Sequence, residues 1–263
     1  MHPDIASIEG IIFDLDGVLW RTSEPIGDLP AIFHRIQNTK WCFVFATNNA
    51  TLSVSQYVEK IHNFGMPVEP QQVITSGVAA AQYLRKKHPK GGPVYIIGES
   101  GLVETLAQSG FYHSENQALA VISSLDRQLT YYKLSRAASL IRSGVPFIST
   151  NADPTLPTPH GFIPGSGSII AALKIASNRR PLIIGKPYRT LFKLALERLG
   201  TKPENTLVIG DQLATDIAGG IAIGCQTALV LSGVTTLELV QNSRYKPNFL
   251  ATDLTSLLDT LIE

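Results

Sequence analysis

Two aspartates that stand two residues apart, Asp14 and Asp16, carry the strongest chemical signal in the sequence. They end an apolar, strand-like run, and side chains at positions i and i+2 of an extended chain point to the same side. Two like charges this close repel each other, and a divalent cation such as Mg²⁺, which prefers oxygen ligands, is the usual compensation. Gly17 lets the chain turn sharply directly after the pair. The pattern predicts a metal-assisted carboxylate site, and a turn or helix-capping aspartate is the alternative.

Two further segments place polar side chains just beyond apolar runs. Thr47 and Asn48 offer a hydroxyl and an amide to an anion, assisted by the backbone N–H groups of a following helix start, although both types also cap helices. Lys186 can neutralise a phosphoryl oxygen, and a solvated surface lysine is the alternative. The phosphate-binding pattern G-x-x-x-x-G-K-[ST] does not fit here, because position 180 is Arg and position 187 is Pro.

A fourth group consists of Asp211, at the end of another apolar run, and Asp216, five residues later. A carboxylate at the end of a buried strand is costly unless it is paired or bound to a metal. Asp216 is expected near the start of the next helix, where an interaction with the helix dipole is the alternative function.

The pattern of apolar runs indicates which elements position these groups. Short runs rich in Ile, Val and Phe predict buried strands at 8–14, 41–47, 181–185, 205–211 and 225–231. Helical patterns lie between them, at about 29–38, 52–63, 188–199, 213–221 and 254–262. This alternation favours a mostly parallel sheet covered by helices on both faces. In such sheets the ligand lies beyond the C-terminal ends of the strands, where the four polar groups stand.

The middle third of the chain repeats the pattern. Strands are predicted at 93–98, 118–123 and 146–150, helices near 130–143 and 169–177, and a Pro-, Gly-, Asn- and Ser-rich connection at 151–168. One long sheet could include all of these strands. An inserted second α/β domain agrees with the pattern at least as well, because the polar residues at strand ends cluster in the outer segments.

Composition limits the function classes. The 263 residues carry 22 Lys and Arg against 21 Asp and Glu, and 44% are hydrophobic, which excludes an intrinsically disordered chain. The net charge of +1 gives no global electrostatic reason to bind nucleic acid or an acidic membrane. No apolar run approaches the roughly 20 residues of a membrane span, and no secretory signal is expected. Cys42 and Cys225 lie in apolar runs, which predicts two buried free thiols and fits a cytoplasmic location.

The order Asp-x-Asp, Thr, Lys and Gly-Asp with a further Asp resembles the haloacid dehalogenase (HAD) superfamily of phosphohydrolases over nearly the whole chain. The middle third is similar to its NagD-like, p-nitrophenylphosphatase-like branch. The segments that carry this similarity are Leu125–Tyr131, Thr150–Asp153 and Pro164–Ser168.

The resemblance implies an α/β fold with a doubly wound, parallel-sheet core and an inserted α/β cap domain. The cap follows the third core strand, so we expect core at 1–76, cap at 77–180 and core again at 181–263. It also implies a Mg²⁺-dependent phosphatase that hydrolyses small phosphate monoesters, such as sugar phosphates, nucleotides or p-nitrophenyl phosphate, through an aspartyl-phosphate intermediate.

The resemblance also implies a role for each residue of the motifs. Asp14 matches the nucleophile and Asp16 the general acid and base. The Mg²⁺ would bind the Asp14 carboxylate, the Asp16 backbone carbonyl and the Asp211 carboxylate. Thr47 and Asn48 would hold phosphoryl oxygens, and Lys186 would balance charge on the nucleophile and the phosphoryl group. Gly17 would support the turn, and Asp216 would support either the metal's water shell or Lys186.

Other expectations concern the cap and the partners. The loop around Asn151 and Asp153 is the candidate contact with the substrate's leaving group, and a turn with side-chain hydrogen bonds is the alternative. Gln212 and the pair Tyr188-Arg189 depart from the branch's usual residues, which affects the expected substrate preference rather than the reaction class. The partner is a small phosphate ester, not nucleic acid or a membrane, and the resemblance suggests a homodimer through the cap. A phospho-ligand-binding regulatory protein with vestigial activity and a phosphotransferase are the alternative functions.

Overall fold

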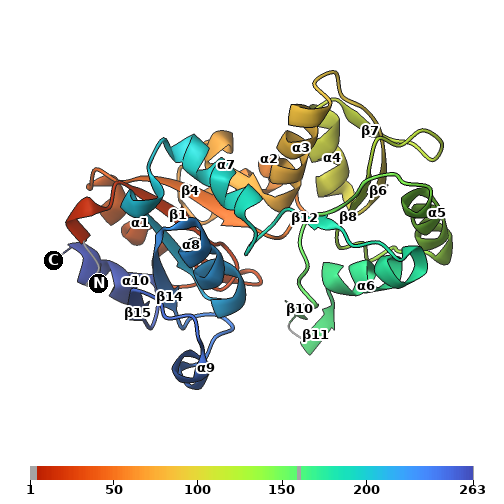
Figure 1. Ribbon diagram of the computed structural model, residues 1–263. Coiled ribbons are helices and arrows are strands. Elements are labelled where there is room, and N and C mark those ends of the chain that lie inside the picture. The colour runs from red at the N-terminus through yellow and green to blue at the C-terminus, as the bar shows by residue number, and fades with distance from the viewer. Residues whose placement is uncertain (1–4, 159–160, 263) are drawn as a thin grey trace. The chain divides into compact units, whose positions relative to one another are not determined.

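The structure is a computed structural model that describes residues 5–158 and 161–262. The chain divides into two compact units, each built from helices and strands (Figure 1). The core unit comprises the described parts of Met1–Thr47, Tyr57–Ile74 and Lys186–Glu263, and the cap unit comprises those of Asn48–Gln56 and Thr75–Gly185. Both units contain parallel strands with helices between them, so the predicted α/β class with an inserted second domain is confirmed.

The core unit is organised by a six-stranded sheet with the order β15-β14-β13-β1-β4-β5. The strands are β1 (Gly10–Phe13), β4 (Cys42–Thr47), β5 (Val73–Thr75), β13 (Thr206–Gly210), β14 (Gln226–Val230) and β15 (Phe249–Ala251). β1 pairs in parallel with β13 on one side and with β4 on the other. All four residues of β1 are buried, as expected for a central strand covered on both faces.

Helices cover both faces of the core sheet. They are α1 (Leu29–Gln37), α2 (Val54–Asn63), α7 (Arg189–Leu199), α8 (Ala218–Ile223), α9 (Leu237–Asn242) and α10 (Leu254–Ile262). Phe33 of α1 lies against Phe43 and Phe45, with ring centroids 5.4 and 5.6 Å apart. The neighbouring side chain of Val44 points to the opposite face, where α7 packs against β4. The arrangement confirms the predicted doubly wound core.

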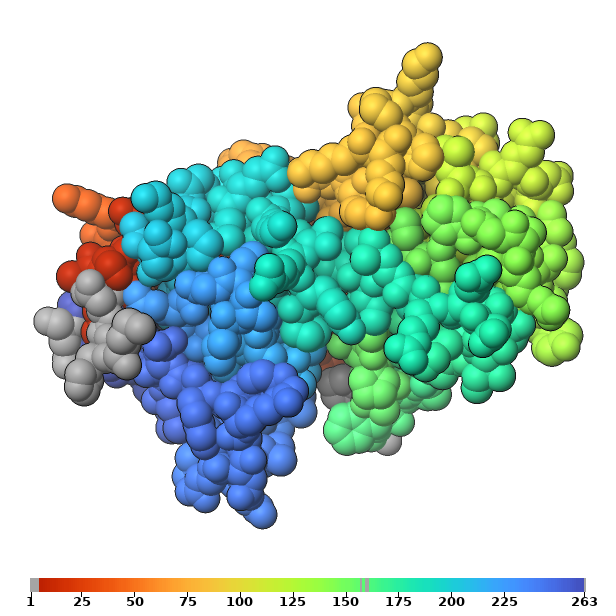
Figure 2. Space-filling model, viewed as in Figure 1, coloured from red at the N-terminus to blue at the C-terminus, as the bar shows by residue number. Residues whose placement is uncertain are grey.

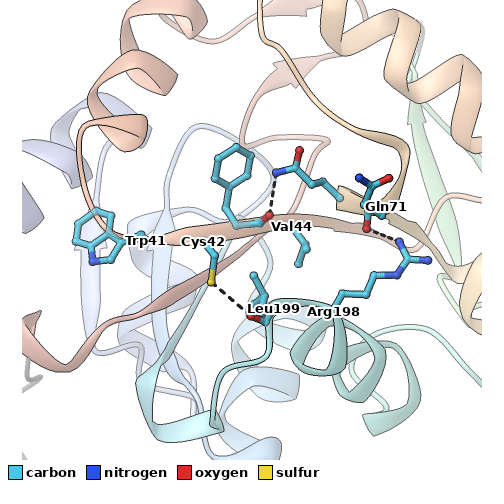
Figure 3. A pocket seen from close by; sticks show the side chains of 8 residues that line it. Trp41, Cys42, Val44, Gln71, Arg198 and Leu199 are labelled. Carbon is cyan, nitrogen blue, oxygen red and sulfur yellow. Dashed lines mark hydrogen bonds between the residues drawn. The ribbon is translucent and has the colours of Figure 1, made fainter.

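A cavity of about 330 Å³ lies beside the first residues of β4 (Figure 3). Cys42 begins this strand and is exposed, and its thiol contacts the carbonyl oxygen of Leu199 at 3.6 Å. The prediction of two buried thiols is therefore wrong for Cys42, because the first residue of a buried strand can still border solvent. Cys225 is buried, as predicted.

The cap unit contains a second sheet, with the order β12-β9-β8-β6-β7. Its strands are β6 (Gly92–Ile97), β7 (Phe111–His113), β8 (Val121–Ser123), β9 (Phe147–Ser149) and β12 (Leu182–Ile183), and the separate hairpin is β10 (Thr155–Thr158) with β11 (Gly161–Pro164). The helices are α3 (Ser76–Lys87), α4 (Ser100–Gln108), α5 (Tyr131–Arg142) and α6 (Ser166–Ser177). Val121, Ile141 and Leu173 belong to one buried cluster, so α5 and α6 share an apolar core with β8.

Three segments differ from the sequence-based expectation. The strand predicted at 181–185 is the short β12, which pairs with β9 in the cap sheet, so the core unit resumes at Lys186. Part of the loop predicted at 151–168 forms the β10–β11 hairpin. The helix predicted at 213–221 begins as a π-helical turn, Leu213–Ile217, before α8.

The core unit also contains elements that the apolar pattern did not predict. A small hairpin, β2 (Trp20–Arg21) with β3 (Glu24–Pro25), follows β1, and α9 precedes β15. α9 lies at the surface of the core unit (Figure 2). Leu237 and Leu239 of this helix are about half exposed. None of the described helices has the length and apolar character needed to cross a bilayer.

Candidate active site

The first carboxylate of the site follows β1 directly. The backbone N–H of Asp14 donates to the carbonyl of Ile209 at 2.8 Å, which continues the β1–β13 pairing by one residue. The Asp14 side chain is 8% exposed. Burial raises the pKa of Asp14 well above its ordinary value, and the positive charge of Lys186 opposes this effect. The strand thus holds a carboxylate in a place where it requires a compensating cation.

Gly17 fits its position for two reasons. Its φ of +86° lies in the left-handed region, which side chains rarely adopt. A Cβ atom at this position would lie 2.5 Å from Oδ2 of Asp211, far inside van der Waals contact. A glycine is therefore required both by the turn after Asp16 and by the close approach of the Asp211 carboxylate.

Lys186 connects two of the carboxylates. Its Nζ lies 2.7 Å from Oδ1 of Asp14 and 2.7 Å from Oδ1 of Asp216, and its side chain is only 4% exposed. Burial alone would lower the pKa of Lys186, but the charges of Asp14 and Asp216 outweigh it and raise the pKa. Lys186 is therefore a buried ammonium held by two carboxylates, and the alternative of a solvated surface lysine is excluded.

Asp211 follows β13 and is fully buried. The N–H of Val234 donates to its Oδ2 at 2.7 Å, whereas its Oδ1 is buried without a hydrogen-bond partner among the described residues. Burial, and after it the charge of Asp216, raise the pKa of Asp211 to about 7 against the opposing effect of the Val234 hydrogen bond. A buried carboxylate oxygen without a donor is what a metal ligand requires.

Asp216 comes from the π-helical turn rather than from a regular helix start. Its Oδ2 accepts a hydrogen bond from the backbone N–H of Gln212 at 3.2 Å. Gln212 is one of the residues that depart from the branch's usual pattern, and this contact uses only its backbone. A side chain at Gly210 would collide with the Asp216 carboxyl group. Local chain geometry therefore fixes this carboxylate against Lys186.

The three carboxylates form one cluster. Asp14, Asp211 and Asp216 each offer an oxygen within 4.8 Å of the others. All donors are oxygens, and the set includes the partnerless Oδ1 of Asp211, so the cluster fits a hard divalent cation. The sequence placed Asp16 rather than Asp216 among the ligands. In the structure the carboxylate cluster includes Asp216, and Asp16 would bind the cation through its backbone carbonyl.

Thr47 and Tyr57 form a second polar pair in the core unit. Thr47 ends β4 and is 2% exposed, and its side chain shares a hydrogen bond with Tyr57. Burial raises the pKa of Tyr57 well above its ordinary value, and the charges of Asp16 and Asp14 add to the effect. Sequence reasoning did not identify Tyr57, because an aromatic residue on an amphipathic helix is indistinguishable from an ordinary core residue.

Three other predicted site residues meet in the cap unit. Asn48 Nδ2 donates to both carboxylate oxygens of Asp153 at 3.2 Å, and Asn151 Nδ2 donates to the backbone carbonyl of Asn48 at 2.8 Å. Ser76 Oγ donates to the same carbonyl at 2.5 Å. In this structure Asn151 and Asp153 therefore hold Asn48 in place. Their contact with a leaving group stays a prediction.

A buried lysine paired with two carboxylates, one directly after a parallel strand and one in a helical turn, defines the class of protein: an α/β protein whose charged site has a place for a divalent cation. Comparison with known proteins gives the family. The model of haloacid dehalogenase-like hydrolases matches residues 11–112, and that of HAD-hydrolase-like proteins matches residues 183–257. The 5'-nucleotidase YutF of Bacillus subtilis is 34% identical over 94% of this chain and 96% of its own length. The protein belongs to the haloacid dehalogenase-like hydrolases.

Solved structures agree with this assignment. The p-nitrophenyl phosphatase from Archaeoglobus fulgidus has a TM-score of 0.91 and 30% identity, over 96% of this chain and 99% of that one. The glycerol phosphate phosphatase Rv1692 from Mycobacterium tuberculosis, solved with magnesium, has a TM-score of 0.87 and 31% identity, over 96% of this chain and 77% of that one. The expected superfamily, its branch and the expected class of enzyme, a phosphoric monoester hydrolase, are confirmed.

Proposed function

We propose that the protein is a Mg²⁺-dependent phosphatase that hydrolyses small phosphate monoesters through an aspartyl-phosphate intermediate. The single observation that carries the proposal is the buried arrangement of Lys186 between Asp14 and Asp216, beside the partnerless oxygen of Asp211. An anionic substrate approaches a nucleophilic carboxylate only where positive charge offsets the repulsion; Lys186 contributes one positive charge here, and a divalent cation held by the carboxylates would contribute the rest.

The chemistry takes place in two displacements. In the first, a carboxylate oxygen of Asp14 attacks phosphorus, the bond between phosphorus and the ester oxygen breaks, and Asp16 gives that oxygen a proton. In the second, water attacks the phosphorus of the aspartyl phosphate, Asp16 takes a proton from that water, and the bond between phosphorus and the Asp14 oxygen breaks, which releases inorganic phosphate and restores the Asp14 carboxylate.

The other residues act on charge and position. Lys186 balances the negative charge of Asp14 and of the phosphoryl oxygens, and Asp216 holds Lys186 in place through its own ion pair. The hydroxyl of Thr47 and the amide of Asn48 are proposed to bind phosphoryl oxygens. The Asp14 and Asp211 carboxylates and the Asp16 carbonyl would hold Mg²⁺, which when bound reduces the repulsion between carboxylate and phosphate.

The relatives suggest the size of the substrate. Their names refer to a nucleotide, to p-nitrophenyl phosphate and to glycerol phosphate, all small monoesters. We infer the same substrate class for this protein. The cytoplasmic location and the homodimer through the cap stay predictions.

The test is phosphate release from a panel of small monoesters, with Mg²⁺ and with excess EDTA. We expect release that requires Mg²⁺ and that Asp14→Asn abolishes without a change in the circular dichroism spectrum. Retained turnover in this variant would refute the assignment of the nucleophile. Tight phosphate binding without turnover would favour a binding protein, and transfer to an added alcohol in place of phosphate release would favour a phosphotransferase.

A further inference from the structure

Trp20 makes an unusual contact for a fully buried aromatic residue. Its side chain has no exposed surface, and its Nε1–H donates to Oδ1 of Asp16 at 2.9 Å. An indole ring has a single N–H donor and no acceptor, so all of its hydrogen-bonding capacity is directed at this carboxylate. The function proposed above uses Asp16 but assigns no role to Trp20.

The backbone brings these two side chains together. After β1 the chain folds back on itself, with the N–H of Leu19 donating to the carbonyl of Leu15 at 2.9 Å and the N–H of Gly17 donating to that of Trp20 at 2.7 Å. Asp16 and Trp20 form an isolated bridge across this turn. The distance between the indole and the carboxylate is therefore set by a closed loop of backbone hydrogen bonds.

Two side chains pack against the indole ring. The ring of Phe64 is stacked on it, with centroids 5.6 Å apart and planes 29° apart. The ammonium of Lys60 lies 4.1 Å from the centroid of the same ring and donates to the carbonyl of Thr22 at 2.9 Å. A ring fixed in this way has little freedom to rotate, and its N–H keeps one direction.

We propose that Trp20 is a positioning residue for the general acid: its N–H fixes the plane of the Asp16 carboxyl group so that the proton is delivered to the leaving oxygen. The inference rests on the function proposed above. A carboxyl group anchored through one oxygen loses rotational freedom before the substrate arrives, and proton transfer depends strongly on such geometry.

The test uses two esters that differ in their need for an acid. p-Nitrophenolate is a weak base and leaves without a proton, whereas the alkoxide of glycerol phosphate must be protonated as it leaves. The ratio kcat/KM covers the steps up to the aspartyl phosphate, in which Asp16 acts only as an acid. Trp20→Phe keeps an aromatic ring and removes the N–H.

For Trp20→Phe we expect kcat/KM for glycerol phosphate to fall about tenfold or more, as for loss of a hydrogen bond to a charged group. For p-nitrophenyl phosphate we expect a fall of less than about twofold, because general acid catalysis contributes little there. Asp16→Asn sets the upper limit, with a loss of about 10²–10⁴-fold confined to the alkyl ester. Equal losses on both esters would reduce Trp20 to a packing residue and overturn the proposal.

The chain provides a matched control, because it contains one other tryptophan. Trp41 lines the cavity beside the first residues of β4 (Figure 3), and Trp41→Phe should leave both values of kcat/KM unchanged. If Trp20→Phe does not fold, Phe64→Leu keeps the N–H but removes the stacked ring, and it should lower the alkyl-ester value selectively by a smaller factor. If the kcat/KM for glycerol phosphate relative to that for p-nitrophenyl phosphate stays unchanged in Phe64→Leu, this result would also contradict the proposal. A wild-type protein without turnover would instead refute the proposed function.

Discussion

Replacing Lys186 by Met tests whether the buried ion pairs organise the site. The side chain is 4% exposed and makes two contacts of 2.7 Å, to Asp14 and Asp216, whose own side chains are 8% and 1% exposed. Removal of one partner from a buried pair costs about 3–5 kcal/mol, because an uncompensated charge stays behind. Here two carboxylates are left, so we expect the free energy of unfolding to fall by at least about 3 kcal/mol.

The assay is urea denaturation in EDTA, followed by tryptophan fluorescence. Both tryptophans, Trp20 and Trp41, lie in the core unit, so the signal reports the unfolding of the unit that contains Lys186. Lys193→Met, at an exposed position of α7, is the control and should change the free energy of unfolding by less than about 0.5 kcal/mol. In the Lys186 variant kcat/KM should also fall by at least about 10², as for loss of a charge-stabilising group.

A loss of stability below about 1 kcal/mol, the range of exposed ion pairs, would refute the reasoning. It would mean that water enters the site and screens the carboxylates. A stable variant with normal activity would also remove Lys186 from the proposed mechanism.

Two other predictions concern the support of Asp211 and the two thiols. Gly233→Ala would place a Cβ atom against Oδ2 of Asp211 and displace this carboxylate. In a metal titration the Mg²⁺ concentration for half-maximal activity should therefore rise roughly tenfold or more. An unchanged concentration would argue against Asp211 as a metal ligand. Iodoacetamide should modify Cys42 before Cys225 in the native protein, because Cys42 is exposed whereas burial raises the pKa of Cys225 to about 12. Peptide mass spectrometry measures both rates, and equal rates in the folded protein would contradict the assigned burial.

The polar residues at strand ends could be predicted from the sequence because two rules apply to them together. An apolar run identifies a buried strand, and parallel strands end at one edge of their sheet. Asp14 and Asp211, which follow the neighbouring strands β1 and β13, are brought together in this way. Lys186 follows a strand of the other sheet, so its contact with Asp14 does not follow from this rule. The same reasoning could not place Asp216 in contact with Lys186, because the intervening π-helical turn changes the direction of side chains relative to a regular helix.

The sequence could not show to which of the two sheets the strand at 181–185 belongs. The run at 181–185 has the composition of a core strand, yet its two paired residues, Leu182 and Ile183, extend the cap sheet beside β9. Apolar character shows that a segment is buried but not against which neighbours it is buried. Lys186 is the first residue of the last core segment, and its place is set there by its ion pairs with Asp14 and Asp216 rather than by the sheet to which β12 belongs.

Trp20 and Tyr57 show why part of the site could not be found from residue types. Both are buried aromatic residues, which periodicity assigns to the core, and both also place a polar atom beside a predicted site residue. Only the closed backbone turn after β1 and the helix position of Tyr57 reveal these contacts. Amphipathic aromatic side chains contribute to packing and to a polar site simultaneously, so burial alone does not separate the two functions.

The charge of the site explains why it combines features that would each destabilise an ordinary core. Three carboxylates and one ammonium leave a formal charge of −2 when all are ionised, in surroundings that raise the pKa of Asp14 and Asp211. Within the described part of the chain Oδ1 of Asp211 has no hydrogen-bond partner, whereas Lys186 pairs with the other two carboxylates. A divalent cation neutralises the remaining charge in full, so the same imbalance that weakens the metal-free core favours binding of the ion that the proposed reaction requires.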